Sequence, residues 1–253
     1  MNKVDAQFSI EKCVFVDIEV NSMQHREPIQ ISYSVGLENA KTEYFKPDNP
    51  IDIYTMSCHH ITDQIVSDFS NFKDSGMLLE FVKLNEEGYI FVSHNTEFDI
   101  QIINKYLTSS GFHSVHNVLC TLLTSRYLHK NKVQTKTPEI YKLQYLRYFY
   151  EIDTFGLCIV PHQADSDVYI LKGILQSLLD TFSVSIKQLT NLSTYLLRPE
   201  NYEMPFGKHK EKKLVDIYNV DASYLHWFVN NMDSEDIIRK IVLFLESTVE
   251  NKK

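Results

Sequence analysis

Short apolar runs rich in β-branched and aromatic residues recur in the first half of the chain. Four of them, at residues 13–20, 29–35, 42–45 and 89–92, predict β-strands, because such residues fit a pleated, half-buried surface. Proline or glycine stands beside several of these runs, where the chain has to turn. The first half of the sequence therefore predicts a sheet.

A spacing of three and four residues between apolar positions predicts helices elsewhere. Phe98, Ile102 and Tyr106 follow this spacing, so a helix is expected directly after the strand at 89–92. Further helices are predicted at residues 60–66, 77–84, 121–129, 140–150, 165–179, 184–197 and 234–248. Strands followed by interleaved helices indicate an α/β fold, with a mixed sheet flanked by helices.

The same pattern divides the chain into three parts. Residues 1–180 contain all the predicted strands and form the expected main domain. Residues 181–202 are expected to form a helical linker. Residues 203–253 are too few to build a large core, so we expect a small C-terminal module there.

Composition narrows the choice of function. The chain has 253 residues and a formal net charge of −8 at pH 7, which disfavours a protein that coats nucleic acid by bulk positive charge. No two of its seven glycines are spaced for a dinucleotide-binding or phosphate-binding loop, so no small-molecule cofactor is expected. The sequence has neither a signal-peptide pattern nor an apolar run long enough to span a bilayer. We therefore expect a cytoplasmic protein that does not act at a membrane.

Two carboxylates lie close together in the first predicted strand. Asp17 and Glu19 are two residues apart, so their side chains leave the same face of the strand. Adjacent carboxylates repel each other unless a cation lies between them, and oxygen ligands suit Mg²⁺ or Mn²⁺ better than zinc. Taken alone, the pair also fits an edge strand that faces solvent.

Two later segments carry further acids and a histidine beside predicted helices. Asp99 falls in the first turn of a helix, where an acid also stabilises the helix dipole. His162 stands just before another helix, where we expect Asp165 to be the N-cap and Asp167 to face inward. Each segment is ambiguous alone, but their order along the chain is restrictive.

Together these motifs resemble the DEDDh group of exonucleases. The resemblance rests on residues 16–19, 60–62, 94–99, 120–121 and 162–168. It implies an RNase H-like fold over roughly residues 12–180. It also implies a 3′→5′ exonuclease that releases 5′-mononucleotides by two-metal-ion hydrolysis of phosphodiester bonds.

The resemblance implies a catalytic centre made of four acids and one histidine. The metal ligands would be Asp17, Glu19, Asp99 and Asp167, holding two Mg²⁺ or Mn²⁺ ions. His162 would be the general base, because a neutral imidazole is available near pH 7.

The resemblance also implies a pocket for the 3′-terminal nucleotide. The residues expected to bind it are Val20, Asn21, His60, Asn95 and Phe98. The family usually continues its first motif with Thr-Thr-Gly, whereas this chain has Val20-Asn21-Ser22. The departure concerns the pocket and leaves the expected metal ligands intact.

The end of the chain resembles the C-terminal module of the exodeoxyribonuclease X-like branch of this family. The likeness rests on residues 206–210, 215–216, 224–228 and 230–233. It favours DNA as the substrate. Trp227, the only tryptophan, is expected to be a core residue of this module.

A basic segment rich in tyrosine is expected to bind DNA. Residues 126–148 carry a net charge of +5, and their tyrosines offer stacking surfaces for unpaired bases. The alternative is a solvated helical face with core tyrosines. A second basic cluster, at residues 208–213, is either a phosphate contact or an exposed turn.

We therefore expect a 3′→5′ exodeoxyribonuclease of DNA repair, acting on single-stranded DNA or on the 3′ ends of duplex DNA. Three alternatives stay open. The first is an exoribonuclease with RNA as its partner, since the metal site does not distinguish ribose from deoxyribose. The other two are a polymerase-associated proofreading subunit and a non-catalytic nucleic-acid-binding module.

Overall fold

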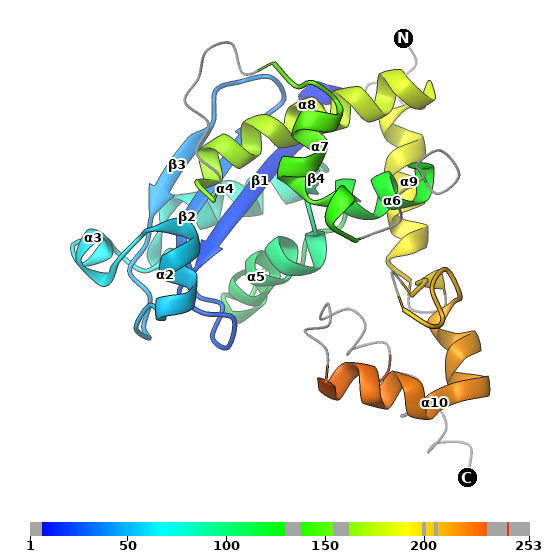
Figure 1. The fold of residues 1–253 in the computed structure, drawn as a ribbon. Coiled ribbons are helices and arrows are strands. Elements are labelled where there is room, and N and C mark those ends of the chain that lie inside the picture. Colours follow the sequence, from blue (N-terminus) through cyan, green and yellow to red (C-terminus); the bar gives the residue numbers. More distant parts are fainter. Residues whose placement is uncertain are drawn as a thin grey trace.

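A five-stranded mixed sheet forms the centre of the protein (Figure 1). The computed structural model describes residues 7–129, 138–153, 162–198, 201–204, 207–231 and 242. The strands are β1 (Cys13–Val20), β2 (Pro28–Val35), β3 (Lys41–Tyr44), β4 (Ile90–Ser93) and β5 (Val118–Cys120), in the order β3-β2-β1-β4-β5. β1 pairs antiparallel with β2 and parallel with β4, so it is the central strand.

Helices cover both faces of this sheet (Figure 1). They are α2 (Ile53–His59), α3 (Asp63–Val66), α4 (Gly76–Glu86), α5 (Thr96–Ser109), α6 (Thr121–His129), α7 (Leu143–Phe149), α8 (Ala164–Phe182), α9 (Ile186–Leu196) and α10 (Leu214–Asn231). Short 3₁₀ helices are η1 (Ile10–Lys12), η2 (Phe72–Asp74) and η3 (Pro138–Tyr141).

Alternate residues of β1 face the two layers of helices. Val16 and Ile18 pack into one core with α4 and α5, whereas Phe15 packs into the other with α8. Because side chains alternate along a strand, Asp17 and Glu19 continue the face that looks toward α8. The fold therefore directs both acids of β1 toward α8.

The structure confirms the α/β fold with a mixed sheet flanked by helices, and most of the predicted elements. The helix predicted at 60–66 is displaced, since only Asp63–Val66 is helical there. The sequence pattern did not indicate α2. Asp52 starts this helix by accepting a hydrogen bond from the backbone N–H of Thr55 at 2.7 Å, and His60 ends it with a left-handed φ of 61°.

One further prediction differs from the structure, and two elements were not predicted. The single helix predicted at 140–150 is two elements, η3 and α7, because the backbone of Lys142 is extended. The unpredicted elements are β5, which has three residues and is too short to produce a recognisable pattern, and α10, which is interrupted by non-helical backbone at Asp221. Apart from residue 242, the helix predicted at 234–248 lies outside the described residues.

The helix in the expected linker packs on the main domain. Ile186 and Leu189 of α9 share a core with α8. Ser193 Oγ accepts a hydrogen bond from the backbone N–H of Cys120 on β5 at 2.8 Å. The helix α9 is therefore held against the edge of the sheet. The domain boundaries given above remain predictions.

The chain after residue 200 builds a small core of its own. Its buried residues include Leu214, Leu225 and Phe228, and Leu123 of α6 packs against them. The expectation that Trp227 is a core residue is wrong, because its side chain lies on the outer side of α10 and is 51% exposed. In the part of the chain that the structure describes, no helix is both long and apolar enough to cross a membrane.

Candidate active site

The two acids of β1 lie where the parallel part of the sheet ends. β1 pairs with β4 only from Cys13 to Phe15, so Asp17 and Glu19 lie beyond the last pair. On its other side β1 continues beside β2, where Glu19 stands opposite Gln30. The carboxyl end of β4, where the chain turns into α5, therefore comes next to both acids.

Asp99 reaches these acids from the first turn of α5. The helix starts after Asn95, which has a left-handed φ of 90°, a conformation that asparagine tolerates. Asp99 is only 4% exposed. The backbone N–H of Ile18 and the hydroxyl of Ser93 lie close enough to its carboxylate to lower its pKa, against the effect of burial. The acid thus lies beside β1, beyond the point where β4 has ended.

Asp167 approaches from the first turn of α8. Its Oδ1 accepts a hydrogen bond from Nε2 of Gln144 at 2.8 Å, and its Oδ2 accepts one from the backbone N–H of His162 at 3.1 Å. Asp167 is 6% exposed and faces inward as expected. The expectation that Asp165 is the N-cap is wrong, because Gln163 occupies that position and Asp165 is exposed in the first turn.

Gln30 ties the start of α8 to the sheet. Its Oε1 accepts a hydrogen bond from the backbone N–H of Ala164 at 3.1 Å. This N–H is one of the donors that the first turn of a helix leaves without a partner inside the helix. Because Gln30 stands opposite Glu19, the bond holds the first turn of α8 beside the acids of β1.

His162 lies at the rim of this group. Its side chain is exposed, and its backbone has a left-handed φ of 59°. A ring nitrogen of His162, a carboxylate oxygen of Glu19 and a carboxylate oxygen of Asp167 all lie within 4.8 Å of one another. The imidazole can therefore reach a molecule bound against these two acids.

Burial makes the four acids difficult to ionise together. Burial, with the neighbouring Asp167 and Asp99 carboxylates, raises the pKa of Glu19 to about 8. Burial likewise raises the pKa of Asp99 to about 7 and that of Asp167 to about 6, although neighbouring donor groups oppose the rise. The pKa of Asp17 is also raised, first by burial and then by the other three carboxylates. Such shifts are expected where carboxylates share a site without a cation.

The donor set fits a hard divalent cation. All four side chains end in carboxylate oxygens, the ligands that suit Mg²⁺ and Mn²⁺. Among the described residues, no lysine or arginine forms an ion pair with any of the four. A bound cation would supply the missing positive charge and relieve the repulsion that raises their pKa values.

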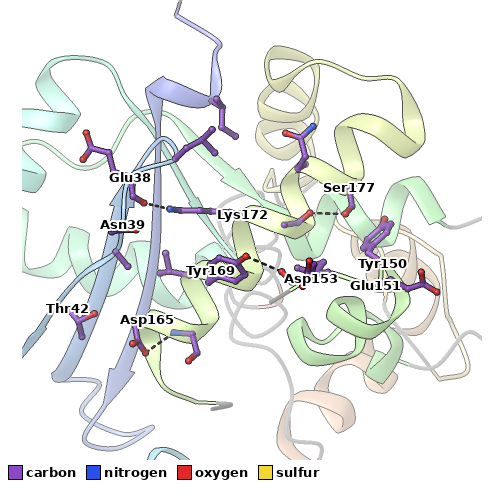
Figure 2. Close-up of a pocket in the computed structure, with 18 residues that line it drawn as sticks. Glu38, Asn39, Thr42, Tyr150, Glu151, Asp153, Asp165, Tyr169, Lys172 and Ser177 are labelled. Carbon is purple, nitrogen blue, oxygen red and sulfur yellow. Dashed lines mark hydrogen bonds between the residues drawn. The ribbon is translucent and has the colours of Figure 1, made fainter. Parts of the chain in front are cut away.

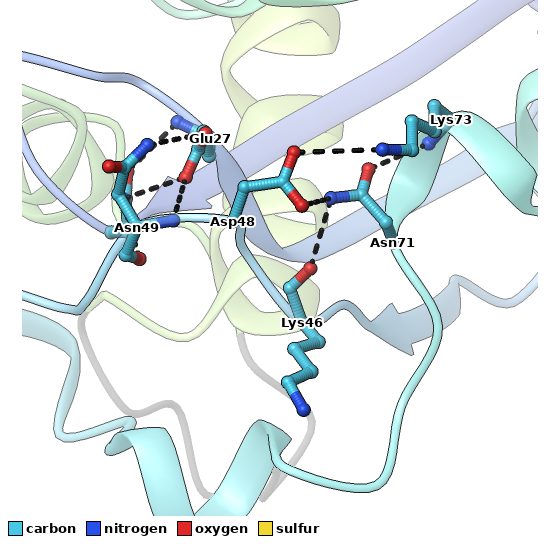
Figure 3. Close-up of polar contacts among 7 residues, drawn as sticks. Glu27, Lys46, Asp48, Asn49, Asn71 and Lys73 are labelled. Carbon is cyan, nitrogen blue, oxygen red and sulfur yellow. Dashed lines mark hydrogen bonds and ion pairs between the residues drawn. The ribbon is translucent and has the colours of Figure 1, made fainter.

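The loop after Glu19 is held by buried polar contacts. Asn21 is fully buried. Its amide donates to the carboxylate of Glu27 and to the backbone carbonyl of Asn49, each at 3.1 Å. Figure 3 shows Asn49 donating in turn to the Glu27 carboxylate. Val20 is also buried. Both residues therefore have a structural role in this loop, and their roles in nucleotide binding remain predictions.

The other expected nucleotide-binding residues lie at helix ends. His60 is exposed at the end of α2, and the adjacent His59 places that end beside β1 through Nε2, 3.2 Å from the carbonyl oxygen of Val20. Asn95 and Phe98 lie at the start of α5, where the Phe98 N–H donates to the Asn95 carbonyl at 2.8 Å. Their contacts with nucleotide remain predictions.

Two residues near the acids had no role in the sequence analysis. Gln144 bonds Asp167 from α7, yet no motif marks it. His94 lies between β4 and α5, and its ring lies 2.9 Å from Oγ1 of Thr121 and 2.7 Å from the carbonyl oxygen of Tyr141. Burial lowers the pKa of His94 to about 4, so its ring is neutral at pH 7.

A groove of about 750 Å³ lies on the outer side of α8 (Figure 2). Asn39 and Thr42 line it from the β3 side, and Tyr169 and Lys172 line it from α8. Asp165 also faces this groove. The two aspartates of the first turn of α8 therefore face different sides of the helix: Asp167 is buried toward the sheet, and Asp165 lies on the groove side.

A family model described as exonuclease matches residues 14–175, well over half of the chain. The chain belongs to the exonuclease family. The matched range includes β1, α5 and the first turn of α8, which carry the four acids. The resemblance to the DEDDh exonucleases is thus confirmed. A second model, described as exodeoxyribonuclease X-like C-terminal, matches residues 204–233 of this exonuclease and confirms the likeness of its tail.

Curated relatives and solved structures agree with this assignment. Exodeoxyribonuclease 10 of Escherichia coli strain K12 is 25% identical over 213 residues, which cover 83% of this chain and 86% of the relative. The structure of exonuclease X in complex with 5′ overhanging duplex DNA has a TM-score of 0.53 and 18% identity, covering 72% of this chain and 99% of that one. Escherichia coli exonuclease I in complex with a dT13 oligonucleotide has a TM-score of 0.55 and 14% identity, covering 75% and 44%. The structural likenesses confirm the RNase H-like fold.

Proposed function

We propose that this exonuclease is a metal-dependent 3′→5′ exodeoxyribonuclease that releases 5′-mononucleotides from DNA ends. The observation that carries the proposal is the convergence of four acids from β1, α5 and α8, two of them buried and two half-buried, with one exposed histidine at their rim. The likeness to exodeoxyribonuclease 10 along most of the chain supports DNA as the substrate.

The four acids would hold two Mg²⁺ or Mn²⁺ ions. When bound, the ions supply a water nucleophile at neutral pH and neutralise charge on the phosphate. The chain's own part is to present oxygen donors in fixed positions, with Asp99 placed beside the Ile18 N–H and Asp167 held by a hydrogen bond from Gln144. Asp17 lies among the other three acids and would hold the ions together with them.

His162 would remove a proton from the attacking water. A general base has to lie within hydrogen-bond reach of the proton that it takes. The exposed ring of His162 lies beside Glu19 and Asp167, where a water bound against these acids would meet it. Its backbone N–H, bonded to Asp167, fixes the start of the side chain.

Exposed aromatic and basic residues around α7 would bind the DNA strand. Tyr145 and Tyr148 are 43% and 72% exposed, and Tyr127 of α6 is 47% exposed. The guanidinium of Arg147 lies 5.1 Å from the ring centre of Tyr148. Stacking faces beside positive charge suit unpaired bases and their phosphates. Three of the basic residues expected here, Lys130, Lys132 and Lys136, lie outside the described residues.

The proposal includes DNA repair in the cytoplasm as the setting, and the 3′ ends of single strands or duplexes as substrates. RNA, a polymerase-bound proofreading role and a non-catalytic binding role are its alternatives. Mononucleotide release from free DNA ends by the isolated chain would set the proposal apart from all three.

Degradation of 3′-labelled DNA and RNA tests the proposal directly. We expect mononucleotide release from DNA with Mg²⁺ or Mn²⁺, weaker release from RNA, and none with a chelator. Asp17→Asn should abolish release, whereas Asp165→Asn, the exposed acid two residues from Asp167, should retain it. Equal activity in the chelator would overturn the metal mechanism, and faster release from RNA would overturn the choice of substrate.

A further inference from the structure

The only tryptophan of the chain lies on the surface of the C-terminal module. Trp227 is 51% exposed, although its neighbours Leu225 and Phe228 are buried in the core of the module. An indole combines a flat apolar face with a polar edge, and interfaces are enriched in such side chains. The position of Trp227 therefore raises the question of its partner.

Tyr224 connects Trp227 with a lysine. The ring centres of Tyr224 and Trp227 are 6.0 Å apart, and the ammonium group of Lys208 lies 5.9 Å from the ring centre of Tyr224. The Lys208 side chain is 66% exposed. Positive charge and aromatic faces are thus neighbours, and we call Lys208, Tyr224 and Trp227 the Trp227 surface.

The turn that carries Lys208 is fixed by contacts within the module. Gly207 has a φ of 84°, and a Cβ atom there would collide with the hydroxyl of Tyr224. Lys208 Nζ and His209 Nε2 both lie 2.8 Å from Oδ2 of Asp221. The His209 ring is 7% exposed and packs edge-on against Tyr224 at 4.9 Å. The arrangement of lysine and aromatic rings is therefore built into the folded module.

The charge of this turn favours a polyanion as the partner. Residues 207–213 contain four lysines and one glutamate, a net charge of +3, and Asp221, which pairs with Lys208, leaves this group at +2 in a chain whose net charge is −8. Bases stack on aromatic rings irrespective of sequence, and the phosphates between them pair with lysine. An apolar protein partner would use the indole but would gain little from the fixed lysine.

We propose that the Trp227 surface binds single-stranded DNA, with a base stacked on Trp227 and a phosphate paired with Lys208. The choice of DNA rests on the proposed function. The surface is separate from the four acids, since α10 lies beyond α9 and away from the sheet (Figure 1). It would hold a strand at a second point on the protein.

Intrinsic fluorescence tests the proposal at the residue itself, because Trp227 is the only tryptophan in the chain. The full-length Asp17→Asn protein in EDTA would be titrated with an oligothymidine of about 20 nucleotides. Anisotropy of a dye-labelled copy of the oligonucleotide reports binding independently. We expect saturable quenching of the tryptophan signal over the same concentration range as the anisotropy change.

Variants of the surface separate stacking from general apolar contact. In the same background, Trp227→Leu should weaken binding about tenfold, whereas Trp227→Phe, which keeps a ring, should weaken it less. Lys208→Ala should reduce the slope of log affinity against log salt by about 0.7. The controls are Val220→Ala, 77% exposed on α10, and Lys83→Ala, 75% exposed on α4, and neither should change binding.

Two results would overturn the proposal: DNA binding without a change in the Trp227 signal, or equal binding by Trp227→Leu and its parent. All variants replace exposed side chains, and matching melting temperatures would exclude misfolding as a cause of lost binding. The binding test needs no catalysis. Quenching with no nuclease activity in the wild-type chain would therefore overturn the proposed function alone.

Discussion

Two acids of the site have supporting groups of their own. Gln144 donates a hydrogen bond to Asp167, and the backbone N–H of Ile18 lies beside Asp99. These groups favour the charged carboxylates, whereas burial disfavours them. Because burial keeps these carboxylates close together, the folded protein without metal should be less stable when they are ionised.

The stability of the metal-free protein should fall as the pH rises from about 5.5 to 8.5. The folded pKa values of Asp167, Asp99 and Glu19 are about 6, 7 and 8, all above the ordinary range near 4. The folded state therefore binds more protons than the unfolded state, and this stabilisation is lost as the pH passes the folded pKa values. Melting in EDTA should show a fall of about 5 °C or more.

Saturating Mg²⁺ should remove most of this pH dependence above neutrality, since the cation replaces the protons. Asp17→Asn should also flatten it and raise the melting temperature in EDTA at pH 8.5, because one buried charge is removed. A melting temperature in EDTA that rises with pH would contradict the account of the four acids.

His162→Ala should lower the rate of mononucleotide release by about 10²–10⁴-fold, because a general base contributes that much. DNA binding should change little, as should the binding of Mn²⁺ by the four acids. His113→Ala, another exposed histidine, is the matched control. Single-turnover rates would measure the effect, and an unchanged rate for His162→Ala would remove it from this role.

Strand pairing and the first turns of the helices position these residues. β1 carries Asp17 and Glu19 on the α8 face, and Gln30 of β2 binds the N-terminus of α8 opposite Glu19. α7 adds Gln144 from the other side. The distance between β1 and the first turn of α8 is therefore set by contacts from two further elements.

Gln144→Ala should weaken the site without abolishing it. Loss of the 2.8 Å bond frees one oxygen of Asp167, and the loss of such supporting bonds typically costs 10–100-fold in metal affinity or activity. The metal concentration giving half-maximal rate should rise for Gln144→Ala and remain unchanged for Gln176→Ala on the groove side of α8. Equal metal dependence in both variants would show that the bond has no part in positioning Asp167.

The sequence predicted which acids come together better than it predicted their surroundings. Strand periodicity puts Asp17 and Glu19 on one face, and the family resemblance added Asp99 and Asp167, each of which follows a helix start. Gln144 and α2 could not be predicted, since Gln144 acts through a contact 23 residues away and α2 depends on the cap at Asp52. Trp227 was misassigned because hydrophobicity alone does not tell which side of α10 faces the module core.

At the scale of the whole molecule, the nuclease fold and the C-terminal module meet through a small apolar contact. Leu123 of α6 and Leu197 pack against the core of the module, which otherwise consists of residues after 200. The four acids and their supporting residues all precede residue 170. The group of four acids therefore draws none of its described residues from the module.

Ending the chain after Arg198 should preserve catalysis while weakening the hold on long strands. We expect unchanged single-turnover rates at saturating DNA and a higher half-saturating concentration for long single strands, because the module's contacts are lost. A circular dichroism melt would check the fold of the shortened protein. Complete loss of folding would show instead that the module and the nuclease domain form one cooperative unit.

The central claim is that four acids from β1, α5 and α8 form one cation-binding cup, and Mn²⁺ binding measured by calorimetry tests it most directly. We predict that the wild-type protein binds Mn²⁺ and that Asp17→Asn, Glu19→Gln, Asp99→Asn and Asp167→Asn each weaken binding at least tenfold. Asp165→Asn should bind as the wild type does. Wild-type affinity in the Asp17, Asp99 and Asp167 variants alike would contradict the claim.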